Sequence, residues 1–489
     1  MFFAITLLFL DFTGTLHTWL GWTAKMQFLP ALLALNAVVI VVLVALTLVF
    51  GRIYCSVICP LGITQDIIAQ IPNRRKKNRY RYSKEKRVLR YGVLAVFIVA
   101  FGLGIGSLVA LLDPYGSFGR IVTHLLQPIY KWGNNGLAAI AEHYESYAFY
   151  STEVWMKSLP TLIIAIASLA LIAVLAWRGG RTYCNTICPV GTILSFLSRN
   201  AWLRIRFDED KCRKCGKCSR NCKAACINFK EKKVDYSRCV VCGDCLQQCE
   251  FDALHYCRPK KAVKSTATAP DATEKATQQP DSGRRAFLLS TALAATAVTL
   301  GEEKMKVDGG LAEIEDKVAP VRTTPITPPG SLSAKNMNTR CVACQLCIAQ
   351  CPNQVLRPST DLTHFMQPTM SYERGHCRPE CHRCSEVCPA GAIQPITLET
   401  KSSTQIGHAV WIKQNCIPVV QGVECGNCMR HCPAGAIEMV PLYADDDTSP
   451  WVPAVDESRC IGCGACENLC PARPISAIYV EGHEVHKEI

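Results

Sequence analysis

Cysteines at fixed short intervals constrain this chain more than any other feature of its sequence, since 30 of its 489 residues are cysteines. The spacing C-x2-C-x2-C-x3-C occurs twice in the middle of the chain, at Cys212, Cys215, Cys218, Cys222 and at Cys239, Cys242, Cys245, Cys249. In this spacing three thiolates hold one iron–sulfur cluster and the fourth reaches the companion cluster. The sequence therefore predicts two [4Fe-4S] clusters, one held by the first triplet with Cys249 and the other by the second triplet with Cys222.

Related motifs recur in the last third of the chain, and each ends in Cys-Pro. The four sets are Cys341, Cys344, Cys347, Cys351; Cys377, Cys381, Cys384, Cys388; Cys416, Cys425, Cys428, Cys432; and Cys460, Cys463, Cys466, Cys470. Pairing neighbouring sets gives Cys388 to the first cluster, Cys351 to the second, Cys470 to the third and Cys432 to the fourth. An interleaved pairing remains open. With the two central clusters, the prediction is six [4Fe-4S] clusters.

Other uses of the cysteines fit the spacing less well. Structural zinc sites usually combine two C-x2-C hooks across a longer loop, and disulfides do not explain six regular triplets. Covalent haem needs C-x-x-C-H, which does not occur. Cys226 and Cys257 fall outside every motif, and we expect either plain thiols or, for Cys226, a competing ligand.

Composition points to a membrane, because 49% of the residues are hydrophobic and only 19% are charged. Apolar runs at 28–50, 88–112 and 160–177 approach the roughly 20 residues of a spanning helix, and 1–22 is a weaker fourth candidate. Basic residues are concentrated in 51–90 and 178–206. The positive-inside rule then places both ends of a four-span block in the cytoplasm.

An internal repeat links two of these spans. The segment 51–62 (GRIYCSVICPLG) returns as 180–191 (GRTYCNTICPVG). Each copy follows an apolar run, so we expect Cys55, Cys59, Cys184 and Cys188 to lie at one depth near the cytoplasmic interface. They are candidates for an additional metal or cluster site; a redox dithiol and ordinary packing are the alternatives.

These features predict a multi-domain chain: an α-helical membrane bundle of four spans plus a fifth, export-signal span, with α+β bacterial-ferredoxin-like modules. The predicted parts are a membrane domain (1–206), a cytoplasmic two-cluster module (207–257), a flexible linker (258–283), a twin-arginine signal or anchor (284–300), a Pro-rich linker (301–335) and a periplasmic four-cluster module (336–489).

The motifs resemble two known families. The first 260 residues, with paired GRxYCxxICPxG segments and a ferredoxin pair, are similar to the NapH-type membrane polyferredoxin subunit. The remainder, with Arg284-Arg285-Ala-Phe-Leu and four cluster motifs, resembles the NapG-type (MauM-like) exported ferredoxin. The resemblance implies an electron-transfer module of a quinol dehydrogenase type. Such a module takes electrons from quinol at the bacterial inner membrane and passes them to a periplasmic reductase or cytochrome.

Membrane lipid and the quinone pool are the expected partners, and we expect no nucleic acid, because the basic residues flank apolar spans. Ionisable residues near a bilayer are functional suspects, so Asp11, His17, Asp113 and His124 are candidates for quinol or proton handling. An alternative function is a redox assembly or maturation factor for a respiratory metalloenzyme. A third is a scaffold whose clusters only stabilise the fold.

Overall fold

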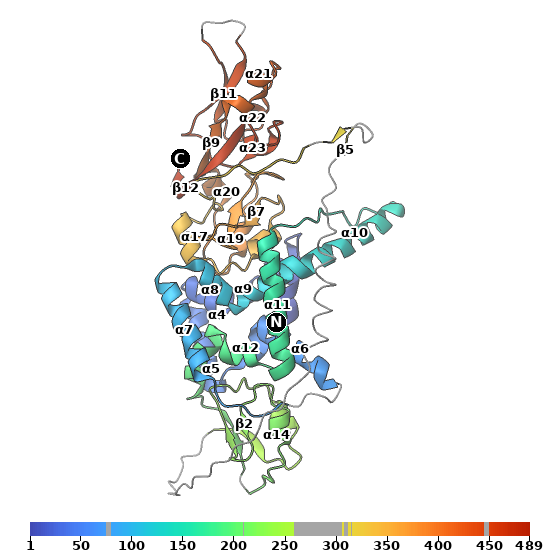
Figure 1. Ribbon diagram of the computed structural model, residues 1–489, viewed down its shortest axis with the longest axis vertical. Helices are drawn as coiled ribbons and strands as arrows, with labels where there is room; N and C mark the ends of the chain where they lie inside the picture. Colours follow the sequence, from blue (N-terminus) through green and yellow to red (C-terminus); the bar gives the residue numbers. More distant parts are fainter. Residues whose placement is uncertain (75–79, 209, 259–305, 308–311, 314, 445–448) are drawn as a thin grey trace, which may run out of the picture. The chain divides into compact units, whose positions relative to one another are not determined.

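In the computed structural model, short helices and two-stranded sheets alternate between the cysteine motifs, and longer helices occupy the N-terminal part (Figure 1). The structure describes residues 1–74, 80–208, 210–258, 306–307, 312–313, 315–444 and 449–489. One compact unit comprises Met1–Arg258 and Lys317–Ile489, and the second comprises Pro259–Asp316. In the second unit the described strands β5 (Lys306–Val307) and β6 (Ala312–Glu313) form an antiparallel pair. The predicted linker 258–283, apart from residue 258, and the signal 284–300 lie outside the described residues.

The N-terminal part of the first unit is helical. Its helices are α1 (Phe2–Leu10), α2 (Thr15–Leu20), α3 (Trp22–Lys25), α4 (Phe28–Leu33), α5 (Ala37–Phe50), α6 (Pro60–Arg74), α7 (Arg87–Gly102), α8 (Gly106–Leu112), α9 (Pro114–Ile121), α10 (Gln127–His143), α11 (Leu159–Gly179), α12 (Thr182–Thr186) and α13 (Pro189–Ser198). The π-helical turns η1 (Tyr54–Ile58) and η2 (Val122–Leu126) interrupt this series.

The prediction of four unbroken spanning helices is wrong. Among the described residues, α11 alone is long and apolar enough to cross a membrane. The run 28–50 breaks between α4 and α5, where Leu35 has a positive φ of 54° and Asn36 accepts a hydrogen bond from the Val39 N–H as a helix cap. The run 88–112 breaks at Gly104, with a φ of 72°.

The segment 1–22 also lacks a spanning helix. Asp11 ends α1, and its Oδ1 accepts hydrogen bonds from the N–H groups of Thr13 and Gly14, while its Oδ2 accepts one from the Leu16 N–H. These bonds turn the chain before α2 begins. The same polar residues that weakened the sequence prediction here therefore break the helix.

The first ferredoxin module has the expected α+β form. Its elements are β1 (Arg204–Phe207), α14 (Lys217–Arg220), β2 (Ile227–Asn228), β3 (Lys233–Val234), α15 (Asp244–Gln247) and β4 (Leu254–Cys257). Strand β1 pairs with β4, and β2 with β3, both antiparallel. Each short helix begins directly after a left-handed glycine, Gly216 or Gly243, inside a cysteine motif.

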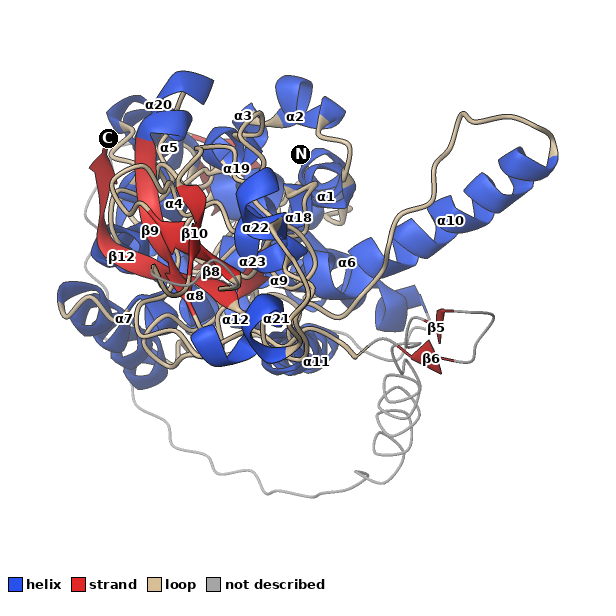
Figure 2. Ribbon diagram, turned by 90° about the horizontal axis from the view of Figure 1, so that it is seen from above, coloured by secondary structure: helices blue, strands red, loops and turns tan. Residues whose placement is uncertain are grey.

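The C-terminal module also combines short helices with two-stranded sheets, and its longest strands are longer than those of the first module. Its elements are α17 (Ala334–Arg340), α18 (Leu346–Gln350), β7 (Leu356–Pro358), β8 (Pro368–Met370), α19 (Arg383–Val387), α20 (Leu398–Ser403), β9 (Thr404–Trp411), the 3₁₀ turn η4 (Lys413–Asn415), α21 (Ile417–Val420), α22 (Asn427–Arg430), β10 (Ile437–Pro441), β11 (Trp451–Val455), α23 (Ala465–Leu469) and β12 (Ile478–Glu488). Strand β9 lies beside β12, with a register shift between Gly482 and Lys487 (Figure 2). Strands β7 and β8, and β10 and β11, form the other antiparallel pairs.

Residues at the two ends of helix α11 contact the two ferredoxin modules. Just before it begins, the Lys157 ammonium donates to the Ile348 carbonyl of the C-terminal module. Just after it ends, the Arg181 N–H donates to the Lys223 carbonyl of the first module. Its 21 residues span about 31 Å at 1.5 Å per residue. Helix α11 therefore runs from contacts with the C-terminal module to contacts with the first module.

Candidate cysteine centres

The six motif sets gather into the neighbouring pairings, each completed by a cysteine from the companion motif. In the first module Cys249 lines one cavity with Cys212, Cys215 and Cys218. Cys222 interacts with Cys239, Cys242 and Cys245, and it adds to the effect of burial, which is the main cause of the raised pKa of Cys245. Each set therefore draws on two separate parts of the chain.

The C-terminal module shows the same exchange of fourth cysteines. Cys351 lines a cavity with Cys377, Cys381 and Cys384, and Cys388 interacts with Cys341, Cys344 and Cys347. Cys470 interacts with Cys416 and Cys428, and Cys432 with Cys460 and Cys463.

Backbone N–H groups point at the fourth cysteine of several sets. The Ala253 N–H donates to Cys249 Sγ, Ala436 to Cys432 Sγ and Ala477 to Cys470 Sγ, each at 3.3 Å. Such bonds stabilise negative charge on sulfur and tune cluster potentials. The donors thus suit thiolates bound to iron.

Burial makes these thiols poor acids on their own. It raises the pKa of Cys218 to about 11 and that of Cys341 to about 12. A bound metal centre deprotonates thiols outright, so these sites hold thiolates once a centre is present. The cavities, the sulfur sets and the N–H donors together fit [4Fe-4S] clusters, which supply one-electron transfer when bound.

A fifth thiol lies inside the first module. Cys226 is buried, and its Sγ lies 3.5 Å from that of Cys222. Hydrogen bonds from Cys226 and from nearby backbone N–H groups lower the pKa of Cys222 to about 7. Cys257, by contrast, is exposed in β4.

The repeated C-x3-C-P segments converge as the duplication predicts. Cys55, Cys59, Cys184 and Cys188 are all buried, and each of the last two interacts electrostatically with the first. Gln65 donates a hydrogen bond to Cys184 Sγ at 3.1 Å. Among the described residues, no three His, Cys, Asp or Glu side chains group as a site for a single metal ion.

Two buried arginines, which the sequence analysis missed, cross between the repeats. Arg52 donates to the Cys184 carbonyl at 3.1 Å, and Arg181 donates to the Cys55 carbonyl. Both side chains are fully buried. The signal was present, since both arginines hold the second position of the repeat.

The last glycine of each repeat leaves room for the arginine that reaches it from the other repeat. A Cβ on Gly62 would lie less than 3.0 Å from the Cys55 carbonyl oxygen, and one on Gly191 would lie equally close to that of Cys184. Arg181 borders the first of these notches and Arg52 the second. The duplicated motif therefore builds one pseudo-symmetric centre from two halves.

The four candidate quinol residues do not meet in one place. Asp11 is occupied by its turn, and Asp113 caps α9 by accepting the Gly116 N–H at 2.6 Å. His124 Nε2 forms a hydrogen bond with Gln345 Oε1 of the C-terminal module at 2.7 Å. His17 lies beside Glu386, near another motif of that module.

Comparisons with known protein families also indicate iron–sulfur domains in this chain. A "4Fe-4S binding domain" family matches twice, at residues 32–79 and 161–208, and a "4Fe-4S dicluster domain" family matches 423–473. The two copies of the first family contain the C-x3-C-P repeats. The fold and the cysteine sets therefore define a ferredoxin-type iron–sulfur protein.

The relatives are ferredoxin-type proteins as well. The chain is 30% identical over 167 residues to the methylamine utilization ferredoxin-type protein MauM of Methylobacillus flagellatus, covering 33% of this chain and 70% of MauM. It is 29% identical over 210 residues to the ferredoxin-type protein NapG of Escherichia coli, covering 39% of this chain and 83% of NapG. For NapF of the same organism the identity is 29% over 159 residues, covering 32% and 87%. The chain belongs to the MauM family of ferredoxin-type proteins.

Proposed function

We propose that this protein is a membrane-bound electron relay with six [4Fe-4S] clusters, which takes electrons from quinol and passes them to a periplasmic reductase or cytochrome. The observation that carries the proposal is the placement of cysteine sets at both ends of α11, whose length is about 31 Å. A relay across a bilayer needs electron carriers on both sides of an apolar barrier.

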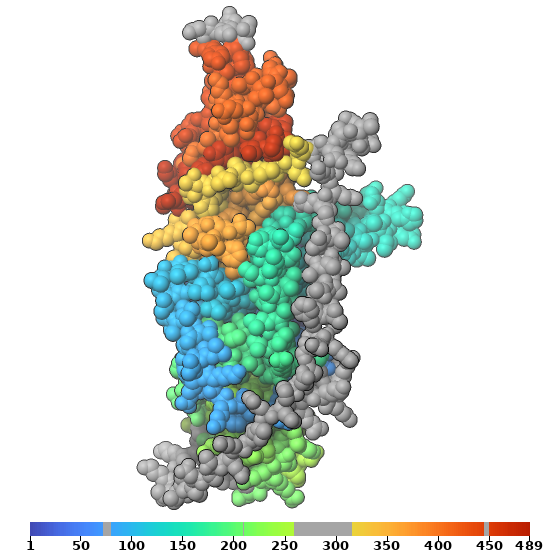
Figure 3. Space-filling view, in the orientation of Figure 1, coloured from blue at the N-terminus to red at the C-terminus, as the bar shows by residue number. Residues whose placement is uncertain are grey.

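Outward-facing apolar side chains support a membrane location. Helices α5, α7 and α11 expose large hydrophobic residues, and α7 and α11 form part of the surface in Figure 3. The exposed set comprises Val38, Val41, Val42, Leu48, Val88, Leu89, Val96, Ile98, Val99, Phe101, Leu159, Ile163, Ile166, Leu171, Val174 and Trp177. Exposed apolar area of this extent marks an interaction with lipid or protein.

The orientation follows from basic residues on one side. The segment after α6 contacts the first ferredoxin module, where the Tyr80 N–H donates to the Arg220 carbonyl and the Ser83 N–H to the Ala225 carbonyl. Arg90 donates to the Ser237 carbonyl at 3.0 Å. By the positive-inside rule this side is cytoplasmic, and the C-terminal module is periplasmic.

The thiol quartet is the proposed seventh centre. Cys55, Cys59, Cys184 and Cys188 lie between the modules, where an intermediate carrier shortens the distance that an electron must cross in one step. The cationic side chains of Arg52 and Arg181 offset the negative charge of a thiolate-ligated centre. The match of both repeats to a 4Fe-4S binding family supports the same assignment.

Quinol oxidation is placed near α9 and η2, where Asp113 and His124 lie close to the C-terminal module. Asp113 is fully buried, and only one of its oxygens accepts a hydrogen bond among the described residues. A carboxylate oxygen left in this state can accept a proton from bound quinol. Asp11 and His17 are kept as weaker proton-handling candidates.

Three measurements test the proposal. Reporter fusions after residue 310 are expected to be active in the periplasm, and anaerobically purified protein is expected to contain about 24 irons, or about 28 with the seventh centre. Quinol should bleach the visible iron–sulfur absorption. A cytoplasmic C-terminal half would instead favour the maturation-factor function, and iron-free protein would refute the relay.

A further inference from the structure

Helix α9 lies directly against the cysteine loop 341–347 of the C-terminal module. A Cβ on Gly116 would come within 3.0 Å of the Val342 carbonyl oxygen, and one on Gly119 equally close to the Cys344 carbonyl oxygen. Only glycine allows the loop and the helix to approach this closely. The contact joins the helical part to the cysteine set Cys341, Cys344, Cys347 and Cys388.

Arg120 fixes this contact. Its fully buried guanidinium donates to the Ala343 carbonyl at 3.3 Å and to the Ala110 carbonyl at 3.1 Å. One side chain thus holds the cysteine loop and the end of α8 together. If the loop moved away from α9, this buried cation would lose the Ala343 carbonyl as an acceptor.

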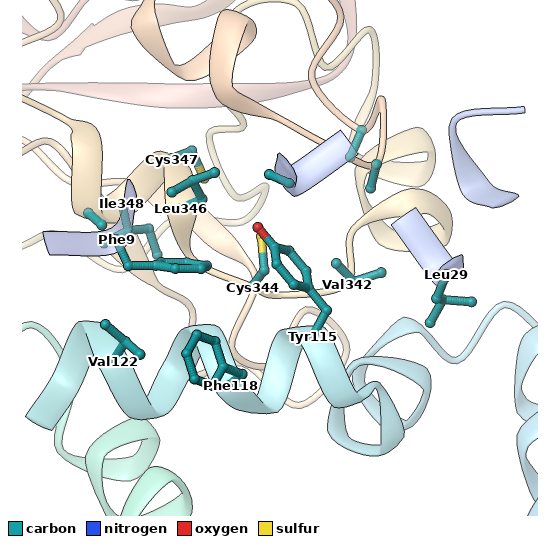
Figure 4. Close-up of a cluster of buried hydrophobic side chains, with 14 of the residues drawn as sticks. Phe9, Leu29, Tyr115, Phe118, Val122, Val342, Cys344, Leu346, Cys347 and Ile348 are labelled. Carbon is teal, nitrogen blue, oxygen red and sulfur yellow. The ribbon is translucent and has the colours of Figure 1, made fainter. Parts of the chain in front are cut away.

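Tyr115, one turn before Arg120, carries a hydroxyl group that needs a partner. Its side chain is 1% exposed, and its Oη has no hydrogen-bond partner among the described residues. In the view of Figure 4 the hydroxyl end of Tyr115 is drawn beside the sulfur of Cys344, with Phe9 and Phe118 nearby, and Tyr115 interacts electrostatically with the Cys344 and Cys388 thiols. Buried hydroxyl groups are normally hydrogen-bonded, so an orphan at a ligand site indicates a missing acceptor.

We infer that Tyr115 Oη donates a hydrogen bond to a sulfur of the centre held by Cys341, Cys344, Cys347 and Cys388, and that this bond raises the reduction potential of that centre. Negative charge on the sulfurs grows on reduction, so a donor stabilises the reduced state more than the oxidised state. Through Tyr115 the helical part tunes one particular centre of the C-terminal module. The inference rests on the proposed clusters and goes beyond them in naming a positioning residue.

The test compares Tyr115→Phe with Tyr372→Phe in the full-length protein, using redox titration followed by electron paramagnetic resonance. Tyr372 is an equally buried tyrosine beside other cysteine sets, but its hydroxyl already donates to the Gly462 carbonyl at 2.7 Å. Tyr115→Phe should lower the midpoint potential of one centre by up to about 59 mV. For a one-electron couple this shift is a tenfold change in the oxidised-to-reduced ratio at a fixed potential. Tyr372→Phe should leave that centre unchanged.

A second readout needs no variant at Tyr115. Incorporated tyrosine carrying ¹⁷O at the hydroxyl should give a hyperfine coupling on one reduced centre of the otherwise unsubstituted protein, and Cys344→Ser should alter that same signal. Unchanged potentials in Tyr115→Phe, or no ¹⁷O coupling on the Cys344 centre, would overturn the inference. Absence of iron would refute the proposed clusters instead, so the two failures are distinguishable.

Discussion

The sulfur atoms of Cys222 and Cys226 lie 3.5 Å apart inside the first ferredoxin module. Cys226 also forms a hydrogen bond with Cys239, so it stands between cysteines that come from both motifs of that module. Its side chain is 1% exposed. A spare thiol in this position is close enough to replace a lost neighbour as an iron ligand.

Cys222→Ala should therefore retain its cluster, whereas the double variant with Cys226→Ala should lose it. The expected difference is about four irons per chain, because one [4Fe-4S] cluster disappears. Iron analysis under anaerobic conditions, with Cys226→Ala alone as the control, measures it. Equal iron in the single and double variants would contradict a reserve role for Cys226.

Replacing Gly62 or Gly191 by alanine should destabilise the packing around the thiol quartet, Cys55, Cys59, Cys184 and Cys188. In Gly62→Ala and Gly191→Ala the new Cβ collides with a cysteine carbonyl, at an expected cost of about 2 kcal/mol or more, in the range of overpacking. Gly92→Ala is the matched control, since nothing lies within 4 Å of its Cβ. That helix substitution should be neutral or stabilising by up to about 1 kcal/mol. Thermal unfolding in detergent distinguishes these outcomes.

Removing one partner of the buried Arg181–Asp66 pair should be strongly destabilising. The guanidinium contacts both carboxylate oxygens, at 2.8 and 2.6 Å. Arg181→Met leaves Asp66 with the Lys223 ammonium at 3.6 Å in a mostly buried site, at a cost of about 3 kcal/mol, the lower end of the range for a broken buried pair. Adding Asp66→Asn should recover part of this loss. Additive effects in the double-mutant cycle, measured by unfolding, would show that the pair is not coupled.

Stability should fall as the pH drops below about 6.5, in part because of His486. Burial and the nearby His483 lower the pKa of His486 to about 4, while the unfolded chain has the ordinary value of about 6.5. Between these values the unfolded state binds the extra proton, so stability is present above pH 6.5 and is lost as the pH falls toward 4. Partial exposure reduces the contribution to about 1–2 kcal/mol.

Thermal unfolding of His486→Gln between pH 4 and 7 measures this contribution. The variant should show a shallower loss of stability in acid than the unsubstituted protein. His143→Gln, at an exposed position at the end of α10, serves as the control. A slope that is the same in both variants would mean that His486 does not carry the effect.

The cysteine sets could be read from the sequence because their ligands are local. A triplet that spans seven residues in four of the six sets, followed by a fourth cysteine, leaves few ways to surround a centre, and the structure gathers the neighbouring sets. The duplicated segments 51–62 and 180–191 likewise predicted that Cys55 and Cys184 would lie at one depth, and the structure brings them together. Composition identified the apolar helices but not their continuity, because one cap at Asn36 and one glycine at Gly104 decided where they break.

The tertiary structure alone decided which distant groups serve these local sets. Arg52 reaches Cys184 across 132 positions, and Arg120 reaches Ala343 across 223. The unpartnered hydroxyl of Tyr115 likewise lies near Cys344 only because α9 packs on a distant loop. Spacing along the chain specifies a ligand set, since its geometry spans a few residues. The charged groups and hydrogen-bond donors around that set depend on which distant segments pack together in the folded chain. A local sequence pattern does not predict that packing.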